Sequence, residues 1–279
     1  MEKRLTAELA YWINERYAIK LRRDEGMPKP WTADRIFQTV RFCNVHREDD
    51  KVTKWIREYW NRAEDPIWKF VLGRMINLPE SLHAIRDSVR LGELSLAKEG
   101  LKNYQRKGNK VFTSAYTIST CGRSMDKLDY VFDHVVSQVA EHEGGITWGE
   151  EQPQCQDMFA WLTQFDGLGT FLAAQVVADM KNTAGHPLQH APDWWTFSAP
   201  GPGSLRGLGW WYAQDPNCVR EKDYYGVLEM CRADVDSLVM EYVPRIGNQD
   251  FQNCLCEFSK YCKRKYLNGH VRNTYNGLR

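Results

Sequence analysis

A pair of glycines separated by one leucine, Gly167-Leu168-Gly169, is the feature of this sequence that most directly suggests chemistry. Apolar stretches lie on both sides, at 159–165 and 170–180, so the pair is expected to join two helices. Glycine lets main-chain N–H groups approach a phosphate closely, and the N-terminal end of a helix is positive. Gly167, Leu168, Gly169 and Thr170 are therefore predicted to bind a nucleic-acid backbone. A plain helical hairpin is the alternative.

An acid and a second glycine-rich motif follow the hairpin. Asp193 is suited to take or orient a proton, and the alternative is an acid that caps a helix. The motif Gly-Pro-Gly-Ser-Leu-Arg-Gly occupies 201–207. Main-chain amides at Gly203 and Ser204, together with the Arg206 guanidinium, predict a turn that binds phosphate or pyrophosphate. An ordinary Gly/Pro turn is the alternative.

Three polar residues recur about one helical turn apart, at Arg41, Asn44 and Arg47. On a helix such residues share one face. Two guanidinium groups and an amide on that face are suited to bind an anion or a base edge. The alternative is a solvated face on which the arginines pair with Glu48 and Asp49.

Aromatic residues beside charged ones are candidates for contacts to a base. Tyr116 can stack on a base while nearby Lys110 contacts phosphate, and core packing of Tyr116 is the alternative. Trp194 follows Asp193 directly. It is predicted to wall a pocket for an extruded base, and burial under the loop is the alternative.

Helical periodicity runs through nearly the whole chain, so we expect an all-α fold. Only 110–119 has a β-like pattern. The length of 279 residues and the absence of a clear linker favour a single helical domain. Its expected parts are a core at about 30–215, C-terminal helices at 218–266 and a basic tail at 260–279. The Gly/Pro-rich loop at 183–209 is long, as functional loops often are.

The bulk composition limits the kinds of partner. Net charge is +1 and the pI is about 7.6, so nucleic acid has to meet a local basic patch. No apolar run reaches the length of a membrane span, and the N-terminus lacks a signal-peptide pattern, so we expect a cytoplasmic protein. The eight cysteines are expected to be reduced. The spacing of Cys254, Cys256 and Cys262 matches no usual metal motif, so no metal ligands are assigned.

Several segments together resemble a known family. They are W-T-x-D-R-I-x-Q-x-x-R-F-C-N-V-x-R-E-x-D at 31–50, K-V-F-T-x-A-Y at 110–116, the hairpin, G-P-G-S-x-R-G-L at 201–208, and C-L-C-E-F-S-K-Y-C at 254–262. The family is that of phage α-glutamyl/putrescinyl-thymine pyrophosphorylases, or amino-acid:DNA transferases. It includes the related helical domain of 5-hydroxymethyluracil DNA kinases. The resemblance covers about 30–265 and implies a helix-hairpin-helix fold derived from DNA glycosylases.

The hairpin departs in part from the glycosylase pattern L-P-G-V-G-x-K-T-A. Both glycines and Ala173 match, whereas Asp166 replaces the proline and Leu172 replaces the threonine. The position of the Schiff-base lysine of bifunctional glycosylases is Phe171 here. A β-lyase that uses this amine is therefore disfavoured.

The resemblance implies work on hypermodified thymine in double-stranded phage DNA, in the host cytoplasm. In the family, a kinase pyrophosphorylates 5-hydroxymethyluracil, and a transferase then displaces pyrophosphate from the 5-methylene carbon with an amino acid or polyamine. The sequence contains no G-x-x-x-x-G-K-[ST], so the kinase reaction is not expected in these residues. A 5-hydroxymethyluracil DNA kinase is an expected partner.

In this scheme Arg206 and the arginines of 41–47 hold the leaving pyrophosphate, and Asp193 deprotonates the incoming amine. A thiolate from Cys43 or Cys121 can add to the pyrimidine ring. No cofactor is assigned, and Mg²⁺ is a candidate to bridge the pyrophosphate. Two alternatives remain: a monofunctional DNA glycosylase in which Asp193 activates water, and a non-catalytic DNA-binding module.

Overall fold

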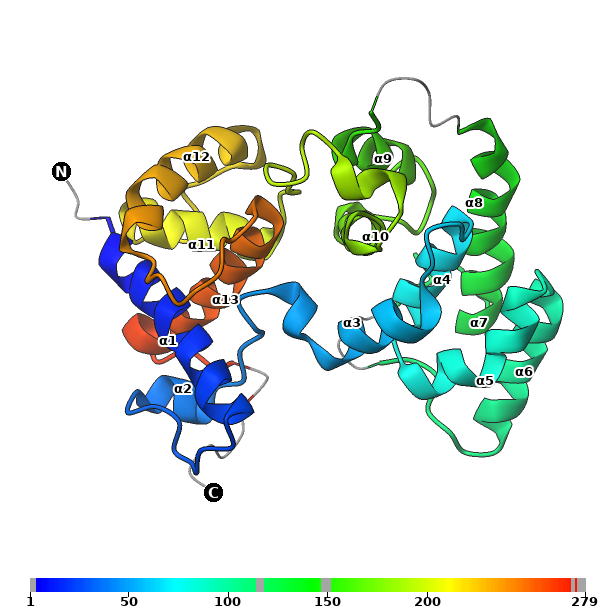
Figure 1. Ribbon diagram of the computed structural model, residues 1–279, viewed down its shortest axis with the longest axis horizontal. Helices are drawn as coiled ribbons and strands as arrows, with labels where there is room; N and C mark the ends of the chain where they lie inside the picture. The colour runs from blue at the N-terminus through cyan, green and yellow to red at the C-terminus, as the bar shows by residue number, and fades with distance from the viewer. Residues whose placement is uncertain (1–3, 114–117, 147–151, 272–273, 275–279) are drawn as a thin grey trace. The chain divides into compact units, whose positions relative to one another are not determined.

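The chain is helical throughout the part that the structure describes. The computed structural model describes residues 4–113, 118–146, 152–271 and 274 (Figure 1). Within these ranges no strand forms, and the one isolated β-bridge joins Val40 and Thr274. The predicted all-α class is therefore confirmed. The kinship to helix-hairpin-helix glycosylases stays a prediction.

The chain divides into two compact units. Unit 1 consists of Met1–Asp50 and Ser198–Arg279, and unit 2 consists of Lys51–Phe197. The expected core at 30–215 crosses both boundaries, because the N-terminal helix packs with the C-terminal helices rather than preceding a separate core. Whether the two units behave as one domain stays a prediction.

Unit 1 is built around the packing of its first helix on its last ones. Its elements are α1 (Thr6–Asp24), α2 (Arg35–Thr39), η1 (Arg47–Asp49), α11 (Pro202–Ala213), η6 (Glu221–Asp223), α12 (Tyr224–Val235), η7 (Asp236–Leu238) and α13 (Asn248–Leu267). The face of α1 that carries Leu9, Trp12 and Ile13 is fully buried. This is the helical spacing that buries one side of an amphipathic helix. The basic residues at 260–265, which were expected to begin a tail at 260–279, belong to α13.

The glycine-rich motif at 201–207 begins a helix rather than forming a turn, so the predicted turn is wrong. Gly201 is the N-cap of α11, and Ser204 Oγ accepts the Gly201 N–H at 3.1 Å. A Cβ added at Gly203 would lie 2.2 Å from the Cys256 sulfur, and one at Gly207 would lie 2.1 Å from the Leu255 carbonyl oxygen. The glycines let α11 approach α13 closely, which the sequence pattern alone did not distinguish from anion binding.

Unit 2 packs its helices around a central, wholly buried one. The elements are α3 (Lys51–Trp55), η2 (Ile56–Trp60), α4 (Ile67–Ile76), α5 (Pro79–Arg90), α6 (Leu94–Arg106), α7 (Lys127–Asp129), η3 (Tyr130–Val136), α8 (Ser137–His142), η4 (Glu143–Gly145), α9 (Cys155–Leu162), α10 (Thr170–Asn182) and η5 (Pro187–His190). Every residue of α4 is buried. A helix that is apolar nearly all round belongs in a core. The β-like stretch at 110–119 has no strand in its described residues, 110–113 and 118–119.

A buried ion pair ties α4 to α10 inside unit 2. Arg74 and Asp179 are 1% and 0% exposed. The Arg74 guanidinium donates to both carboxylate oxygens, with Nη2–Oδ1 at 2.5 Å, and Nη1 donates to Asn77 Oδ1 at 3.0 Å. Arg57 donates to the main-chain oxygen of Asp179 at 2.5 Å. Such a pair tolerates burial only because its remaining hydrogen-bonding capacity is used.

None of the described helices is long and apolar enough to cross a membrane.

Candidate functional site

The glycine pair of unit 2 lies between two helices, as its sequence predicts. It connects α9 to α10 at residues 163–169. Gly167 has φ +93°, and a Cβ there would lie 2.6 Å from the Tyr130 hydroxyl oxygen. Leu168 is buried, whereas Gly169 is exposed with open space where a Cβ would stand. The N-terminus of α10 thus faces solvent, in the arrangement suited to bind a phosphate. Its binding to DNA stays a prediction.

Charged side chains surround this hairpin. Asp166 accepts hydrogen bonds from Arg123 and from His134 Nε2, the latter at 3.0 Å. Arg123, followed by His134, holds the pKa of the Asp166 carboxyl below its usual value. The Tyr130 hydroxyl donates to the Cys121 sulfur at 3.3 Å. Sequence reasoning missed Arg123 and His134, and the acid at the position of the family's proline was the signal that could have found them.

Asp193 caps a helix at the opposite end of the same helix pair. Its Oδ1 and Oδ2 accept the N–H groups of Cys155 and Gln156, both at 2.8 Å. These N–H groups open α9, an eight-residue helix that spans about 12 Å before the hairpin begins. The contacts are those of the capping alternative. The role of Asp193 as a base stays a prediction.

Trp194 packs against α10. Its indole N–H donates to the Lys181 carbonyl at 2.9 Å, and Lys181 Nζ donates to the Trp194 carbonyl at 2.8 Å. The buried Lys181 ammonium lies 4.4 Å from the centre of the Trp194 ring, within reach of a cation–π interaction. The Trp194 ring is thus half-buried and packs against Lys181 of its own unit. Its predicted contact with an extruded base stays a prediction.

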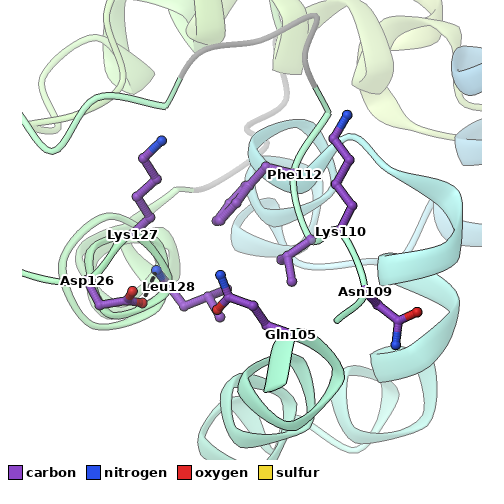
Figure 2. Close-up of a pocket in the computed structure, with 8 residues that line it drawn as sticks. Gln105, Asn109, Lys110, Phe112, Asp126, Lys127 and Leu128 are labelled. Carbon is purple, nitrogen blue, oxygen red and sulfur yellow. Dashed lines mark hydrogen bonds between the residues drawn. The ribbon is translucent and has the colours of Figure 1, made fainter. Parts of the chain in front are cut away.

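Lys110 lies at a small cavity of unit 2. The cavity has a volume of about 300 Å³ and is lined by Gln105, Asn109, Lys110, Val111, Phe112, Asp126, Lys127 and Leu128. Figure 2 shows Lys110 and Lys127 on either side of Phe112. Two ammonium groups beside an aromatic ring suit an anion, so contact of Lys110 with phosphate stays a prediction. Tyr116, predicted to stack on a base, lies outside the described residues.

The polar residues of the 41–47 segment do not share a helical face, so that prediction is wrong. Arg41 and Asn44 lie in the irregular loop between α2 and η1, which begins in extended conformation at Val40, and Arg47 is the first residue of η1. The buried Arg16 holds this loop by donating to the Cys43 carbonyl at 2.7 Å and to Asn44 Oδ1 at 2.5 Å. Arg47 pairs with Glu48 at 3.1 Å. The hydrogen bonds from Arg16 hold this segment in a loop, although the spacing of its polar residues is helical. Arg41 is exposed.

A second group of reactive side chains forms where this loop meets α11 and α13 of unit 1. We call it the motif cluster, and it consists of Cys43, Arg206, Cys256, Glu257 and Lys260. Glu257 is only 2% exposed. Its Oε2 accepts the Cys43 main-chain N–H at 3.3 Å, and its Oε1 lies 2.5 Å from Lys260 Nζ. Arg206 is exposed on α11.

The electrostatics of the motif cluster link its members. Burial, then the Glu257 charge, raises the pKa of the Cys43 thiol to about 12, although this residue keeps solvent access. Burial also raises the pKa of Cys256, whereas Lys260 and Arg206 lower it. Burial lowers the pKa of Lys260, but Glu257 more than compensates, so that pKa is raised. The cluster combines two thiols, a carboxylate and two cations.

Sequence reasoning placed Arg206 in a site, assigned Lys260 to the basic tail and missed Glu257. Both lie in the 254–262 segment, which was weighed for metal ligands. Their spacing of three residues on a helix, which favours ion pairing, was the available signal. Within the described ranges, no group of three or more His, Cys, Asp or Glu side chains is arranged to hold a metal ion.

Comparisons with known proteins show what this chain is similar to. Residues 3–269 match the family model described as 5-hmdU DNA kinase, helical domain. A 5-hmdU DNA kinase of Bacillus phage SP10 is 25% identical over 283 aligned residues, covering 90% of this chain and 44% of that protein. The chain thus spans less than half the length of this relative. No solved structure matches the chain.

Proposed function

Because this chain belongs to the family of the 5-hmdU DNA kinase helical domain, we propose that it acts in the hypermodification of thymine in phage DNA. The specific reaction proposed is transfer of an amine, from an amino acid or polyamine, to the 5-methylene carbon of pyrophosphorylated 5-hydroxymethyluracil, with release of pyrophosphate. The SP10 relative, named as a kinase that acts on 5-hmdU in DNA, supports a role on the same modified base.

One observation carries the specific reaction. Three segments that are far apart in sequence and similar to the transferase family, at 31–50, 201–208 and 254–262, meet in the motif cluster. The convergence puts two cations, Arg206 and Lys260, beside a thiol and a buried carboxylate. Fixed cations next to the site of bond breaking stabilise the charge that develops on a leaving pyrophosphate. A glycosylase that activates water has no comparable use for them.

The proposal divides the work between the two units. Arg206 and Lys260 of unit 1 hold the pyrophosphate, together with any Mg²⁺ that it carries. In unit 2, the exposed start of α10 at Gly169 and Thr170 binds the backbone of double-stranded DNA. A 5-hydroxymethyluracil DNA kinase supplies the pyrophosphorylated base, because the 279 residues contain no P-loop motif.

The direct test is mass spectrometry of nucleosides. Duplex DNA carrying pyrophosphorylated 5-hydroxymethyluracil is incubated with the protein and a mixture of amines, with and without EDTA. We expect a thymine derivative with an amine on the 5-methylene carbon, and an equal amount of released pyrophosphate. Abasic sites without such an adduct would show a glycosylase instead, and DNA binding without any product would show a binding module.

A pair of arginine variants tests the pyrophosphate site. Arg206→Ala removes an exposed cation of the motif cluster, and Arg220→Ala removes an exposed arginine of the same unit outside it. We expect Arg206→Ala to abolish turnover while binding to unmodified duplex persists, and Arg220→Ala to behave as the parent protein. An equal loss of duplex binding and turnover in Arg206→Ala would make this residue a backbone contact.

A further inference from the structure

We propose that Cys43 is a catalytic nucleophile that adds to C6 of the target pyrimidine, and that Glu257 is the base that takes its proton. The inference rests on the proposed function, since it supplies a route for the amine transfer. The thiol addition can be tested separately from the amine transfer, because it can be observed on a pyrimidine that carries no pyrophosphate and without any amine.

The geometry of the motif cluster supports these two roles. The Glu257 carboxylate accepts the Cys43 main-chain N–H at 3.3 Å, which fixes the residue that carries the thiol next to the base. Glu257 influences the thiol both as a charge and as a hydrogen-bond partner. Lys260 Nζ lies 2.5 Å from the buried carboxylate and pairs with it. Arg16 also holds the loop in place, because its Nε donates to the Cys43 carbonyl.

The Cys43 thiol needs a base to remove its proton when the sulfur attacks. With a pKa raised to about 12, Cys43 is protonated at neutral pH and does not act as a standing thiolate. A carboxylate in contact with it can accept the proton as the sulfur attacks. The residue is exposed, so an extruded pyrimidine can approach it from the surface of unit 1.

The reaction proceeds in two balanced halves. The Cys43 S–H proton passes to Glu257, the sulfur bonds to C6, and the C5=C6 electron pair moves onto the C4 carbonyl as an enolate. The enolate then re-forms the carbonyl and expels pyrophosphate, which leaves with the C–O electron pair and creates an exocyclic C5=CH2 bond. The amine nitrogen adds to this CH2 and regenerates the enolate. Collapse of the enolate restores C5=C6 and releases the sulfur, which recovers its proton from Glu257.

Cys121 and Cys218 are also exposed, and each has a different neighbour. Cys121 in unit 2 accepts a hydrogen bond from the Tyr130 hydroxyl, and the nearby carboxylate, Asp166, is engaged by Arg123 and His134. Cys218 in unit 1 contacts the Gly209 carbonyl at 3.8 Å. Cys43, by contrast, has the buried Glu257 carboxylate as its neighbour.

Deuterium exchange at C5 of 2′-deoxyuridine tests the nucleophile. Addition of the thiol to C6 of this base gives an enolate that takes a deuteron at C5, and reversal then leaves deuterium on the ring. A duplex with one 2′-deoxyuridine is incubated with the protein in D2O, and its nucleosides are analysed by mass spectrometry. We expect exchange with the parent protein, none with Cys43→Ser, and full exchange with the matched control Cys218→Ser. Glu257→Gln should slow exchange about 10²–10⁴-fold, as loss of a general base does.

The outcomes separate this inference from the proposed function. Absence of exchange with the parent protein overturns the role of Cys43, even where the amine adduct forms. Retention of exchange or of amine transfer by Cys43→Ser, with circular dichroism unchanged, also overturns it. Loss of exchange in Cys121→Ser instead would move the nucleophile to unit 2. Exchange without any amine adduct would keep the nucleophile and remove the proposed transfer reaction.

Discussion

Each unit of the molecule buries a carboxylate, and the two are held in different ways. Asp179 in unit 2 is 0% exposed, and its carboxylate is held by Arg74, which is 1% exposed. Glu257 in unit 1 is 2% exposed, but its partners reach the surface. They are Cys43, which is solvent-accessible, and Lys260, whose side chain is 35% exposed.

This difference suits the first carboxylate to a structural role and the second to the proposed role as a base. The pair in unit 2 has no access to a substrate, and it joins α4 to α10, so its effect is on stability. The carboxylate in unit 1 is shielded from water yet one contact away from groups that a substrate can touch. A buried carboxylate can serve as a base in a reaction only where an accessible group can deliver a proton to it.

The largest expected effect is the loss of the buried pair in unit 2. Asp179→Asn leaves Arg74 buried without its counter-charge, so we expect the free energy of unfolding to fall by about 3–5 kcal/mol. Glu257→Gln should cost only about 1 kcal/mol, because Lys260 can turn toward solvent and the amide oxygen can still accept the Cys43 N–H. Urea unfolding of both variants measures the difference. Equal losses would break the comparison.

Acid should destabilise unit 2 through His186. Burial lowers the pKa of this imidazole from 6.5 to about 4. Between these values the unfolded chain binds a proton that the folded chain does not, so stability is complete above pH 6.5 and falls as pH decreases toward 4. The group contributes about 3 kcal/mol to this loss.

The control for this pH effect is His186→Asn, whose side-chain oxygen can accept the Leu188 N–H as His186 Nδ1 does. Unfolding of the two proteins in urea is followed across pH 4–7. The variant should lose less stability on acidification than the parent protein. Identical slopes would assign the acid sensitivity to other groups.

The two glycine motifs should respond oppositely to alanine. A methyl group at Gly207 meets the Leu255 carbonyl oxygen at 2.1 Å, so Gly207→Ala should cost about 1–3 kcal/mol through overpacking. Gly169 has open space, and Gly169→Ala should cost at most about 1 kcal/mol, because alanine is a poorer N-cap. The second variant should instead weaken duplex binding, since the added methyl blocks close approach of phosphate. Thermal unfolding and duplex titration test the pair.

These glycines also show what the sequence can predict. The periodicity of apolar residues identified α1, the hairpin helices and α13, because burying one face of a helix requires that spacing. A glycine, however, has no side chain to indicate its neighbour. Gly167–Gly169 and Gly203–Gly207 both fit an anion-binding motif, and only the position of α13 shows that the second pair is filled by protein.

The candidate site was predicted in part for a similar reason. Arg206 was identified because a guanidinium after a glycine-rich motif suits a phosphate or pyrophosphate. Glu257 and Lys260 were not, since their value depends on Cys43, which is more than two hundred residues away in sequence. Asn44 was misplaced on a helix, because Arg16 from another segment determines the shape of its loop. Long-range hydrogen bonds leave no local pattern.

The smallest expected effect on stability concerns Asp193, the acid of unit 2 that is predicted to deprotonate the amine. Asparagine caps helices about as well as aspartate, so Asp193→Asn should change the free energy of unfolding by less than about 0.5 kcal/mol. If Asp193 acts as a helix cap alone, amine transfer by this variant stays at the level of the parent protein, because its oxygens accept the N–H groups of Cys155 and Gln156. A decrease of about 10²–10⁴-fold with stability unchanged would make Asp193 the base for the amine, so that unit 2 would also carry a carboxylate with a role in the reaction.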